Sequence, residues 1–228
     1  DIDVLTSAPS PGPTVEPFAD NIRIHKVGIR KQNLHLWRRS EVLAWLCKAG
    51  RHYRRLLREN TYDLAHAFFG FPTAWLCYRT ASRLPYIISL RGSDVPGANA
   101  RLQLEYKILG PLVFKPVWQR ASALVACSEG LRQRALRFMP SAQISVIPNG
   151  VDLERFSPPE TRPAEAKPLR LITVGRLSTT KRLPLLIEAV ETLARQGCDV
   201  TLTIVGGGAL EAELRQRISA ERLRGVVT

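Results

Sequence analysis

Short apolar runs alternate with longer stretches of helical periodicity along this chain. The short runs predict strands over residues 2–6, 22–27, 86–90, 124–127, 144–147, 169–174 and 200–205. The longer stretches predict helices over residues 36–57, 72–82, 102–120, 130–138, 183–195 and 210–222. Strands that alternate with helices indicate parallel β-α-β units, and continuously apolar strands suit a sheet covered on both faces. The predicted fold class is therefore α/β with parallel sheets.

One stretch without periodicity divides this pattern. Residues 157–168 are rich in proline and in charged residues, which is typical of a linker. We therefore expect a first domain over residues 1–156 and a second over residues 169–228. The chain opens directly on a strand pattern, and the second domain offers only two β-α units and the start of another strand. We expect the first domain to lack its beginning and the second to be incomplete.

The charge of the chain is concentrated in one segment. The 228 residues carry 33 Lys and Arg against 20 Asp and Glu, a net charge of +13. Eleven of the basic residues and a single acid fall between Arg23 and Arg58. Such an excess favours an anionic partner: nucleic acid, a membrane surface or a phosphorylated substrate. No recognised nucleic-acid motif is present, so nucleic acid is not the expected partner.

The helix predicted over residues 36–57 carries much of this charge. Its apolar stripe consists of Leu43, Leu46, Gly50, Tyr53 and Leu57, and its basic stripe of Lys48, Arg51, Arg55 and Arg58. Trp37 and Trp45 fall off the apolar stripe, so we expect them to be partly exposed. Basic residues beside tryptophans suit an anionic membrane surface, which residues 35–58 would contact. A solvated helix face is the plainer interpretation, and both stay open.

The remaining composition narrows the cellular setting. No apolar run reaches the ~18–20 residues that cross a bilayer, and the chain does not open on a signal-peptide pattern. The four cysteines are scattered without a C-x-x-C pair, which suits a reducing compartment. We expect a cytoplasmic protein, peripheral at the inner face of the cell membrane if the basic helix binds there. We identify no ligand cluster for a metal and expect no cofactor.

The loop after the strand at 169–174 is the first candidate for chemistry. Gly175, Arg176 and Lys181 lie between that strand and the next helix, at an edge where α/β proteins bind ligands. A helix N-terminus with two added cations suits a diphosphate, while two solvated surface cations are the alternative. The triple glycine at 206–208 lacks the spacing of a dinucleotide fingerprint and predicts a tight turn.

A second group of candidates follows the strand at 86–90. Arg91, Gly92 and Asp94 come directly after it, and Asp94 would either cap the next segment or contact a hydroxylated substrate. His66 is either an acid–base group or a packed core histidine. Asn149 and Gly150 end the last strand of the first domain, and this dipeptide favours a turn with positive φ.

Six segments follow one another in the order of a known motif set. They are residues 62–67 (YDLAHA), 85–94 (PYIISLRGSD), 126–129 (ACSE), 146–156 (VIPNGVDLERF), 174–181 (VGRLSTTK) and 205–208 (VGGG). Together they resemble the retaining family-four glycosyltransferases, whose GT-B fold consists of two Rossmann-like domains. The segments at 146–156 and 174–181 are the specific ones, and the former resembles the crossing between the two domains. The resemblance spans nearly the whole chain.

This resemblance implies a glycosyltransferase that moves a sugar from a UDP- or GDP-linked donor to a glycan, lipid or other acceptor, with retention. It assigns Gly175, Arg176 and Lys181 to the donor diphosphate, without a metal, and the first domain to the acceptor. Arg91 stands where many members have His, which puts any role of that imidazole in doubt. The alternative function is a non-catalytic basic module that binds an anionic membrane surface or partner.

Two family features are not found among the 228 residues. The glycine-rich N-terminal loop would precede the strand on which the chain opens, and the paired glutamates would follow residue 228. Glu213 and Glu221 have the spacing of that pair but come too early in the chain, so we expect them to be solvated. We therefore expect the chain alone to be nearly inactive.

Overall fold

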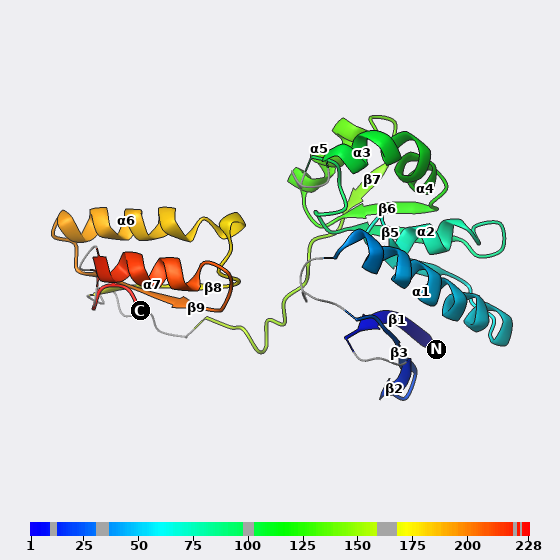
Figure 1. The fold of residues 1–228 in the computed structure, drawn as a ribbon, viewed down its shortest axis with the longest axis horizontal. Helices are drawn as coiled ribbons and strands as arrows, with labels where there is room; N and C mark the ends of the chain where they lie inside the picture. The colour runs from blue at the N-terminus through cyan, green and yellow to red at the C-terminus, as the bar shows by residue number, and fades with distance from the viewer. Residues whose placement is uncertain (10–12, 31–36, 98–102, 159–167, 221–222, 224) are drawn as a thin grey trace. The chain divides into compact units, whose positions relative to one another are not determined.

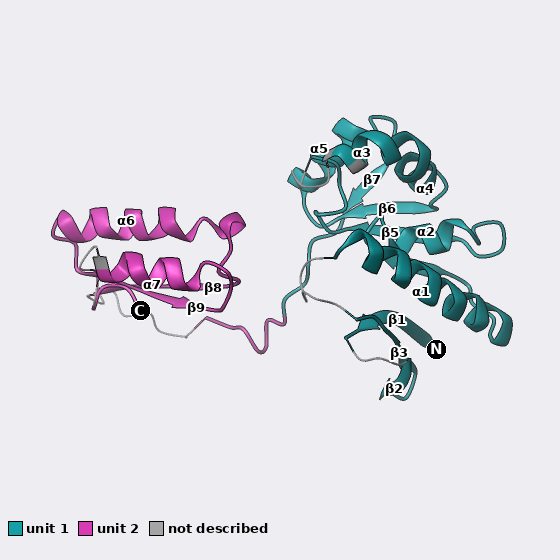
Figure 2. Cartoon of the chain, in the orientation of Figure 1, with its two compact units in different colours: residues 1–151 teal, residues 152–228 magenta. Residues whose placement is uncertain are grey.

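The computed structural model describes residues 1–9, 13–30, 37–97, 103–158, 168–220, 223 and 225–228. Its chain divides into two compact units, residues 1–151 and residues 152–228 (Figure 2). Each unit has apolar core clusters of its own, so each is described by itself. Within the described ranges, no helix is both long and apolar enough to span a membrane.

The first unit contains two sheets (Figure 1). The smaller sheet has the order β1-β3-β2 and consists of β1 (Ile2–Ala8), β2 (Thr14–Ala19) and β3 (Ile22–Gly28). β1 and β3 are parallel, whereas β2 runs antiparallel to β3. The larger sheet is parallel throughout and follows the chain order: β4 (Ala65–Phe68), β5 (Tyr86–Leu90), β6 (Ala123–Ala126) and β7 (Ile144–Val146). Its four carboxyl ends therefore meet at one edge.

Helical segments connect these strands. They are α1 (Arg39–Glu59), α2 (Thr73–Tyr78), α3 (Gln103–Leu109), the π-helical η2 (Gly110–Phe114), α4 (Lys115–Gln119) and α5 (Glu129–Phe138). The core against the parallel sheet is built on Tyr86, Ile88 and Leu90 of β5 and on Trp118 of α4, all fully buried. The single helix predicted over 102–120 is three segments from residue 103 onward, and residue 102 lies outside the described residues. Pro111 has no N–H for a regular α-helical ladder at the point where η2 intervenes.

The second unit is a small parallel α/β layer. It consists of β8 (Leu169–Val174), the 3₁₀ turn η3 (Thr179–Lys181), α6 (Leu183–Arg195), β9 (Val200–Val205) and α7 (Glu211–Ala220). β8 and β9 pair in parallel along their whole lengths, and Val227 forms a parallel bridge to Leu202 of β9. Ile187, Leu202 and Leu214 join the two helices and the strands in one buried core.

The apolar pattern predicts most of these elements. The parallel α/β class is confirmed, and β5, β8, β9 and α6 have the predicted bounds. The pattern misses β2, because all of its residues are exposed, and β4, which is short and exposes His66 and Phe68. The predicted helix over 72–82 ends at Tyr78 and continues as turns. Residues 36, 221 and 222 of two other predicted helices lie outside the described part of the chain.

The buried face of α1 differs from the predicted one. Trp45 is only 5% exposed and packs with Ala49 and Val27, whereas Leu43 of the predicted apolar stripe is 63% exposed. The prediction that Trp45 is partly exposed is therefore wrong. Positions four apart along the helix, such as 41, 45 and 49, also share one face, and this is the face that meets β3 and α2.

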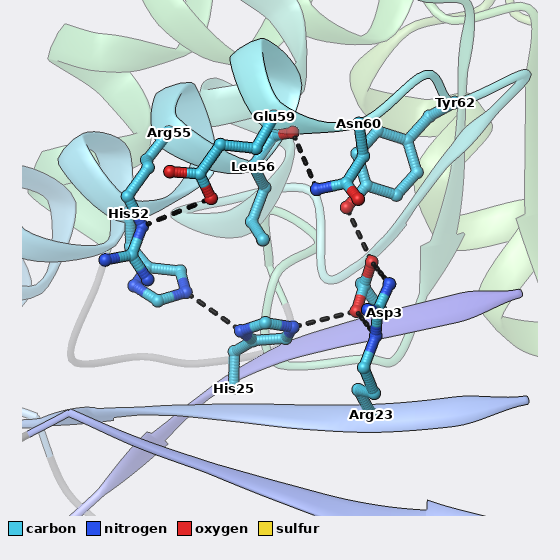
Figure 3. A network of polar contacts seen from close by, with 9 residues as sticks. All are labelled: Asp3, Arg23, His25, His52, Arg55, Leu56, Glu59, Asn60 and Tyr62. Atoms are coloured by element: carbon cyan, nitrogen blue, oxygen red, sulfur yellow. Dashed lines mark hydrogen bonds and ion pairs between the residues drawn. The ribbon is translucent and has the colours of Figure 1, made fainter. Parts of the chain in front are cut away.

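A polar network connects the smaller sheet to the end of α1 and the segment before β4 (Figure 3). The Asp3 carboxylate has a side chain only 3% exposed and accepts two hydrogen bonds from Arg23, at 2.9 and 3.0 Å. His25 Nε2 lies 2.8 Å from Asp3 Oδ1, and the Tyr62 hydroxyl donates to Oδ2 at 2.6 Å. His52 Nε2 lies 3.0 Å from His25 Nδ1, which extends the network to α1.

These contacts determine the ionisation of the Asp3 carboxyl. Burial raises its pKa, but the hydrogen bonds from Tyr62, His25 and Arg23 outweigh burial and lower the pKa from 3.8 to about 2. The folded state therefore favours the carboxylate. This contribution to stability is complete above about pH 4 and is lost as the pH falls toward 2.

We predict that Asp3→Asn lowers the free energy of unfolding of the first unit by about 2 kcal/mol at pH 7, because a shift of nearly two pKa units is lost. Denaturant unfolding followed by tryptophan fluorescence measures this, since all four tryptophans lie in the first unit. Asp63→Asn, at an exposed position, is the matched control. Equal stabilities of the two variants, or a difference that does not shrink between pH 4 and pH 2, would contradict the prediction.

Candidate functional site

Two loops lie together at the carboxyl edge of the second unit, one after β8 and one after β9. The Gly175 N–H donates to the Val205 carbonyl and the Leu177 N–H to the Gly207 carbonyl, both at 2.9 Å. The Leu210 N–H then donates to the Leu177 carbonyl at 3.1 Å. Backbone pairing therefore continues beyond the ends of the strands and fixes the first loop against the second.

This close approach requires glycine at two of the three positions after β9. A Cβ on Gly206 would lie 1.9 Å from the Gly175 carbonyl oxygen, and one on Gly208 would lie 2.5 Å from the Leu177 carbonyl oxygen. Gly206 also has a φ of 149°. A Cβ on Gly207 would meet nothing within 4 Å. The predicted tight turn is thus also a backbone contact surface for the loop after β8.

The cations of the first loop project from this fixed backbone. The Leu177 side chain is buried in the core of the unit, whereas Arg176 and Lys181 are exposed. The Lys181 side chain folds back over the loop. Its Cε lies 3.8 Å from the position that a Cβ on Gly175 would take. Both predicted cations are therefore exposed side chains of one loop, a planar guanidinium fork and a mobile ammonium.

The segment between the loop and α6 contains a turn that the sequence does not predict. Residues 179–181 form a 3₁₀ turn, and α6 then begins at Leu183, where the helix is predicted to begin. Arg182 lies between them with a left-handed φ of 51° and an exposed side chain. This third cation is missed by sequence reasoning. Its only signal is its position next to Lys181.

A second group of polar side chains lies at the carboxyl ends of β4 and β5 in the first unit. His66 Nε2 lies 2.8 Å from the Ser89 hydroxyl, and the His66 ring stacks on Phe68 at a centroid distance of 4.5 Å. The Arg91 guanidinium carbon lies 5.8 Å from the centroid of the same Phe68 ring. Burial lowers the pKa of His66, which favours a neutral imidazole with one donor and one acceptor nitrogen. Sequence reasoning assigns no role to Phe68 or Ser89, because it does not identify β4.

Asp94 holds the loops after β4 and β5 together. It is 4% exposed, and its carboxylate accepts from the Gly70 N–H at 2.6 Å and from the Arg91 and Gly92 N–H groups at 2.9 Å each. Burial raises the pKa of this carboxyl, and the backbone donors act against that rise. Gly92 has a left-handed φ of 112°. Of the two interpretations of Asp94, these contacts favour the structural one.

The segment from Asn149 to Gly150 lies directly before the division between the units, which falls after Val151. Both residues are exposed. The expectation of a turn with positive φ is wrong, because neither residue has one. The turn comes later: the Glu154 and Arg155 N–H groups both donate to Asp152 Oδ1 at 3.1 Å. Asp152 thus organises the start of the second unit.

Two residues of α1 on which the membrane-binding interpretation depends make contacts within the first unit. Lys48 of the basic stripe donates to the Gly28 carbonyl at 3.0 Å, and Trp45 is buried. Glu213 is exposed at the start of α7, and Glu221 lies outside the described residues. Over the described ranges, no group of three or more His, Cys, Asp or Glu side chains is arranged to hold a metal.

Comparison with known proteins identifies the class. Residues 1–155 match the family model Glycosyltransferase Family 4, and residues 158–228 match Glycosyl transferases group 1. The chain therefore belongs to glycosyltransferase family 4. It is 32% identical over 134 residues to the amylovoran biosynthesis glycosyltransferase AmsK of Erwinia amylovora, an alignment that covers 59% of this chain and 28% of AmsK.

Solved structures confirm the GT-B fold. The sucrose-phosphate synthase of Thermosynechococcus elongatus superposes with a TM-score of 0.72 at 20% identity, over 99% of this chain and 59% of that one. Anabaena HepE in complex with UDP gives a TM-score of 0.56 at 21% identity, over 79% of this chain and 50% of that one. Alignments with three curated relatives cover 21%, 28% and 40% of the relatives' own lengths, so the chain spans less than half of each.

We predict that Gly206→Ala opens the contact between the two loops of the second unit, because the new methyl group and the Gly175 carbonyl oxygen cannot occupy the same space. The unit should lose more than about 2 kcal/mol of stability, and the Gly175 and Leu177 amide protons should exchange faster. Gly207→Ala is the matched control and should leave both amides protected. Hydrogen exchange followed by NMR measures this. Equal protection in the two variants would show that the contact does not exist.

We predict that Asp94→Ala destabilises the first unit by about 3 kcal/mol, because three backbone N–H groups lose their acceptor. Asp94→Asn should cost less, since it retains one oxygen. Ser93→Ala, at the exposed neighbouring position, should be close to neutral. Denaturant unfolding followed by tryptophan fluorescence ranks the three variants. If Asp94→Ala unfolds like Ser93→Ala, the carboxylate does not hold the two loops.

Proposed function

We propose that this chain carries the diphosphate-binding loop and the acceptor-side face of a glycosyltransferase. The donor is a sugar linked to UDP or GDP, and the acceptor is a carbohydrate or a lipid-linked glycan. The observation that carries the proposal is the placement of Arg176 and Lys181 on one loop, fixed by backbone hydrogen bonds at the carboxyl edge of β8 and β9. The name of AmsK, an amylovoran biosynthesis glycosyltransferase, and the UDP bound to HepE support the same class of reaction.

The chemistry follows from the charge that develops during transfer. As the bond between the sugar and the diphosphate breaks, negative charge accumulates on the departing diphosphate oxygens. Arg176 and Lys181 would stabilise that charge, and because the loop backbone is already fixed, little reorganisation is needed at that moment. Leu177, buried beside them, anchors the loop while the two cations contact the ligand.

On the first unit, the proposed acceptor side is the surface that contains His66, Arg91 and Gly92. A neutral His66 imidazole, paired with Ser89, would accept or donate a hydrogen bond to a sugar hydroxyl. Phe68 offers an exposed ring on which the apolar face of a sugar can stack. Asp94 acts here as a positioning residue, through the backbone of Arg91 and Gly92. Retention at the anomeric carbon is part of the proposal through the family resemblance.

We predict that Arg176→Ala with Lys181→Ala abolishes measurable binding of UDP and GDP by this chain and lowers sugar transfer by the whole protein at least 100-fold, because two charge-assisted contacts to the diphosphate are lost. Calorimetry measures nucleotide binding. A transfer assay, corrected for hydrolysis of the donor, measures the rate of sugar transfer. Arg170→Ala with Arg215→Ala is the control: it removes two exposed arginines of the second unit, one in β8 and one in α7. NMR of the product's anomeric proton tests retention.

Two outcomes would contradict this proposal. If the double variant at residues 176 and 181 transfers sugar as well as the control does, the loop does not bind the diphosphate. If neither nucleotide binds the unaltered chain and the protein transfers no sugar from either donor, the proposed donor class is wrong.

A further inference from the structure

A hollow of about 760 Å³ lies in the first unit at the edge of the parallel sheet opposite to His66 and Arg91. Its walls come from the end of α1, from the residues before β4 and from the turn that leads from α2 to β5. The lining consists of Arg51, Arg54, Leu57, Arg58, Asn60, Thr61, Tyr62, Arg79, Thr80, Ser82, Arg83 and Leu84. Because these residues precede β4 and β5, the hollow is at the amino ends of the strands, away from the proposed acceptor side.

The lining of this hollow has a single sign of charge. It includes five arginines from two separate segments, residues 51–58 of α1 and residues 79–83, and no carboxylate. All five arginines are exposed. The nearby Glu59 lies 3.8 Å from Arg55, which is not part of the lining. Five like charges around one concavity repel one another, and an anion bound between them would remove that repulsion.

Three of the neutral polar groups of the lining are engaged by the protein. The Tyr62 hydroxyl donates to Asp3, the Asn60 amide donates to the Leu56 carbonyl at 3.2 Å, and the Thr80 hydroxyl donates to the Cys77 carbonyl at 3.0 Å. The Asp3 charge is in turn matched by Arg23, and His25 forms a further hydrogen bond with the same carboxylate. Among the lining guanidinium groups, that of Arg54 donates through Nε to the Gly50 carbonyl at 3.1 Å. The exposed guanidinium groups are the charged parts of the wall, and guanidinium forks pair with phosphate oxygens.

We propose that this arginine-lined hollow binds a soluble small molecule that carries two or more phosphate groups. Its volume lies in the range of small-molecule pockets, about 300–1,000 Å³, and two segments with arginines on each can bridge phosphates that are several ångströms apart. Since the hollow lies at the opposite edge of the sheet from the proposed acceptor side, this ligand is bound and not converted.

Calorimetric titration with sodium tripolyphosphate tests the proposal. It is done on the chain with Arg176→Ala and Lys181→Ala, so that the proposed donor loop does not contribute. In that background, Arg79→Gln with Arg83→Gln should weaken binding at least tenfold. Arg134→Gln with Arg137→Gln removes the same charge from exposed positions of α5 and should change binding less than twofold. If the first pair impairs folding, seen as a shifted tryptophan-fluorescence melt, Arg51→Gln with Arg54→Gln takes its place.

Vesicles of phosphatidylglycerol distinguish a lipid headgroup from a free ligand. Binding of tripolyphosphate that depends on the hollow, with no dependence of vesicle binding on residues 79 and 83, supports the proposal. Three results would overturn it: no binding of tripolyphosphate, equal weakening by the two arginine pairs, or binding to vesicles alone. Because the donor-loop residues are already replaced, these results are independent of the proposed sugar transfer.

Discussion

The pairing of backbone groups beyond the ends of β8 and β9 is the constraint on which the proposed chemistry depends. Parallel strands end at the same edge, but strand ends alone leave their loops free to diverge. Here the Gly175 and Leu177 N–H groups continue the ladder, and Gly206 leaves the space that this continuation needs. A loop fixed in this way holds its cations beside the strand ends, and the 3₁₀ turn and the left-handed Arg182 connect it to α6.

The sequence predicts best where one physical signal dominates. Short, mostly apolar runs predict β5, β8 and β9, and their bounds agree with the structure, although β8 has no fully buried residue. β2 carries no such signal because it is exposed throughout, and β4 is too short to show a period. In α1 two overlapping stripes satisfy helical spacing, and only the position of β3 decides that Trp45 is inside. The choice between them is a tertiary property that no local pattern contains.

The same distinction applies to the candidate sites. Arg176 and Lys181 are found from the sequence because strand, glycine and cation follow one another locally. Ser89 is not, because it meets His66 only through the pairing of β4 with β5. Phe68 is not, because it stacks with His66 along β4, a strand that the pattern does not identify. Asn149 and Gly150 show the opposite error: a local preference for positive φ is overridden, and Asp152 forms the turn through its own side chain.

The basic residues that give the chain its net charge therefore have different roles. Arg23 and Lys48 are satisfied within the fold, by Asp3 and by the Gly28 carbonyl. The arginines at the ends of α1 and α2 face a common hollow without a carboxylate in its wall. At Asp3 the fold gains stability because opposite charges are paired, and the Tyr62 hydroxyl donates to that carboxylate. Tyr62 also lines the hollow, whose arginine charges are not matched by a carboxylate of the lining. Since unmatched like charges cost free energy in the unbound chain, the hollow is more stable with an anion than without one.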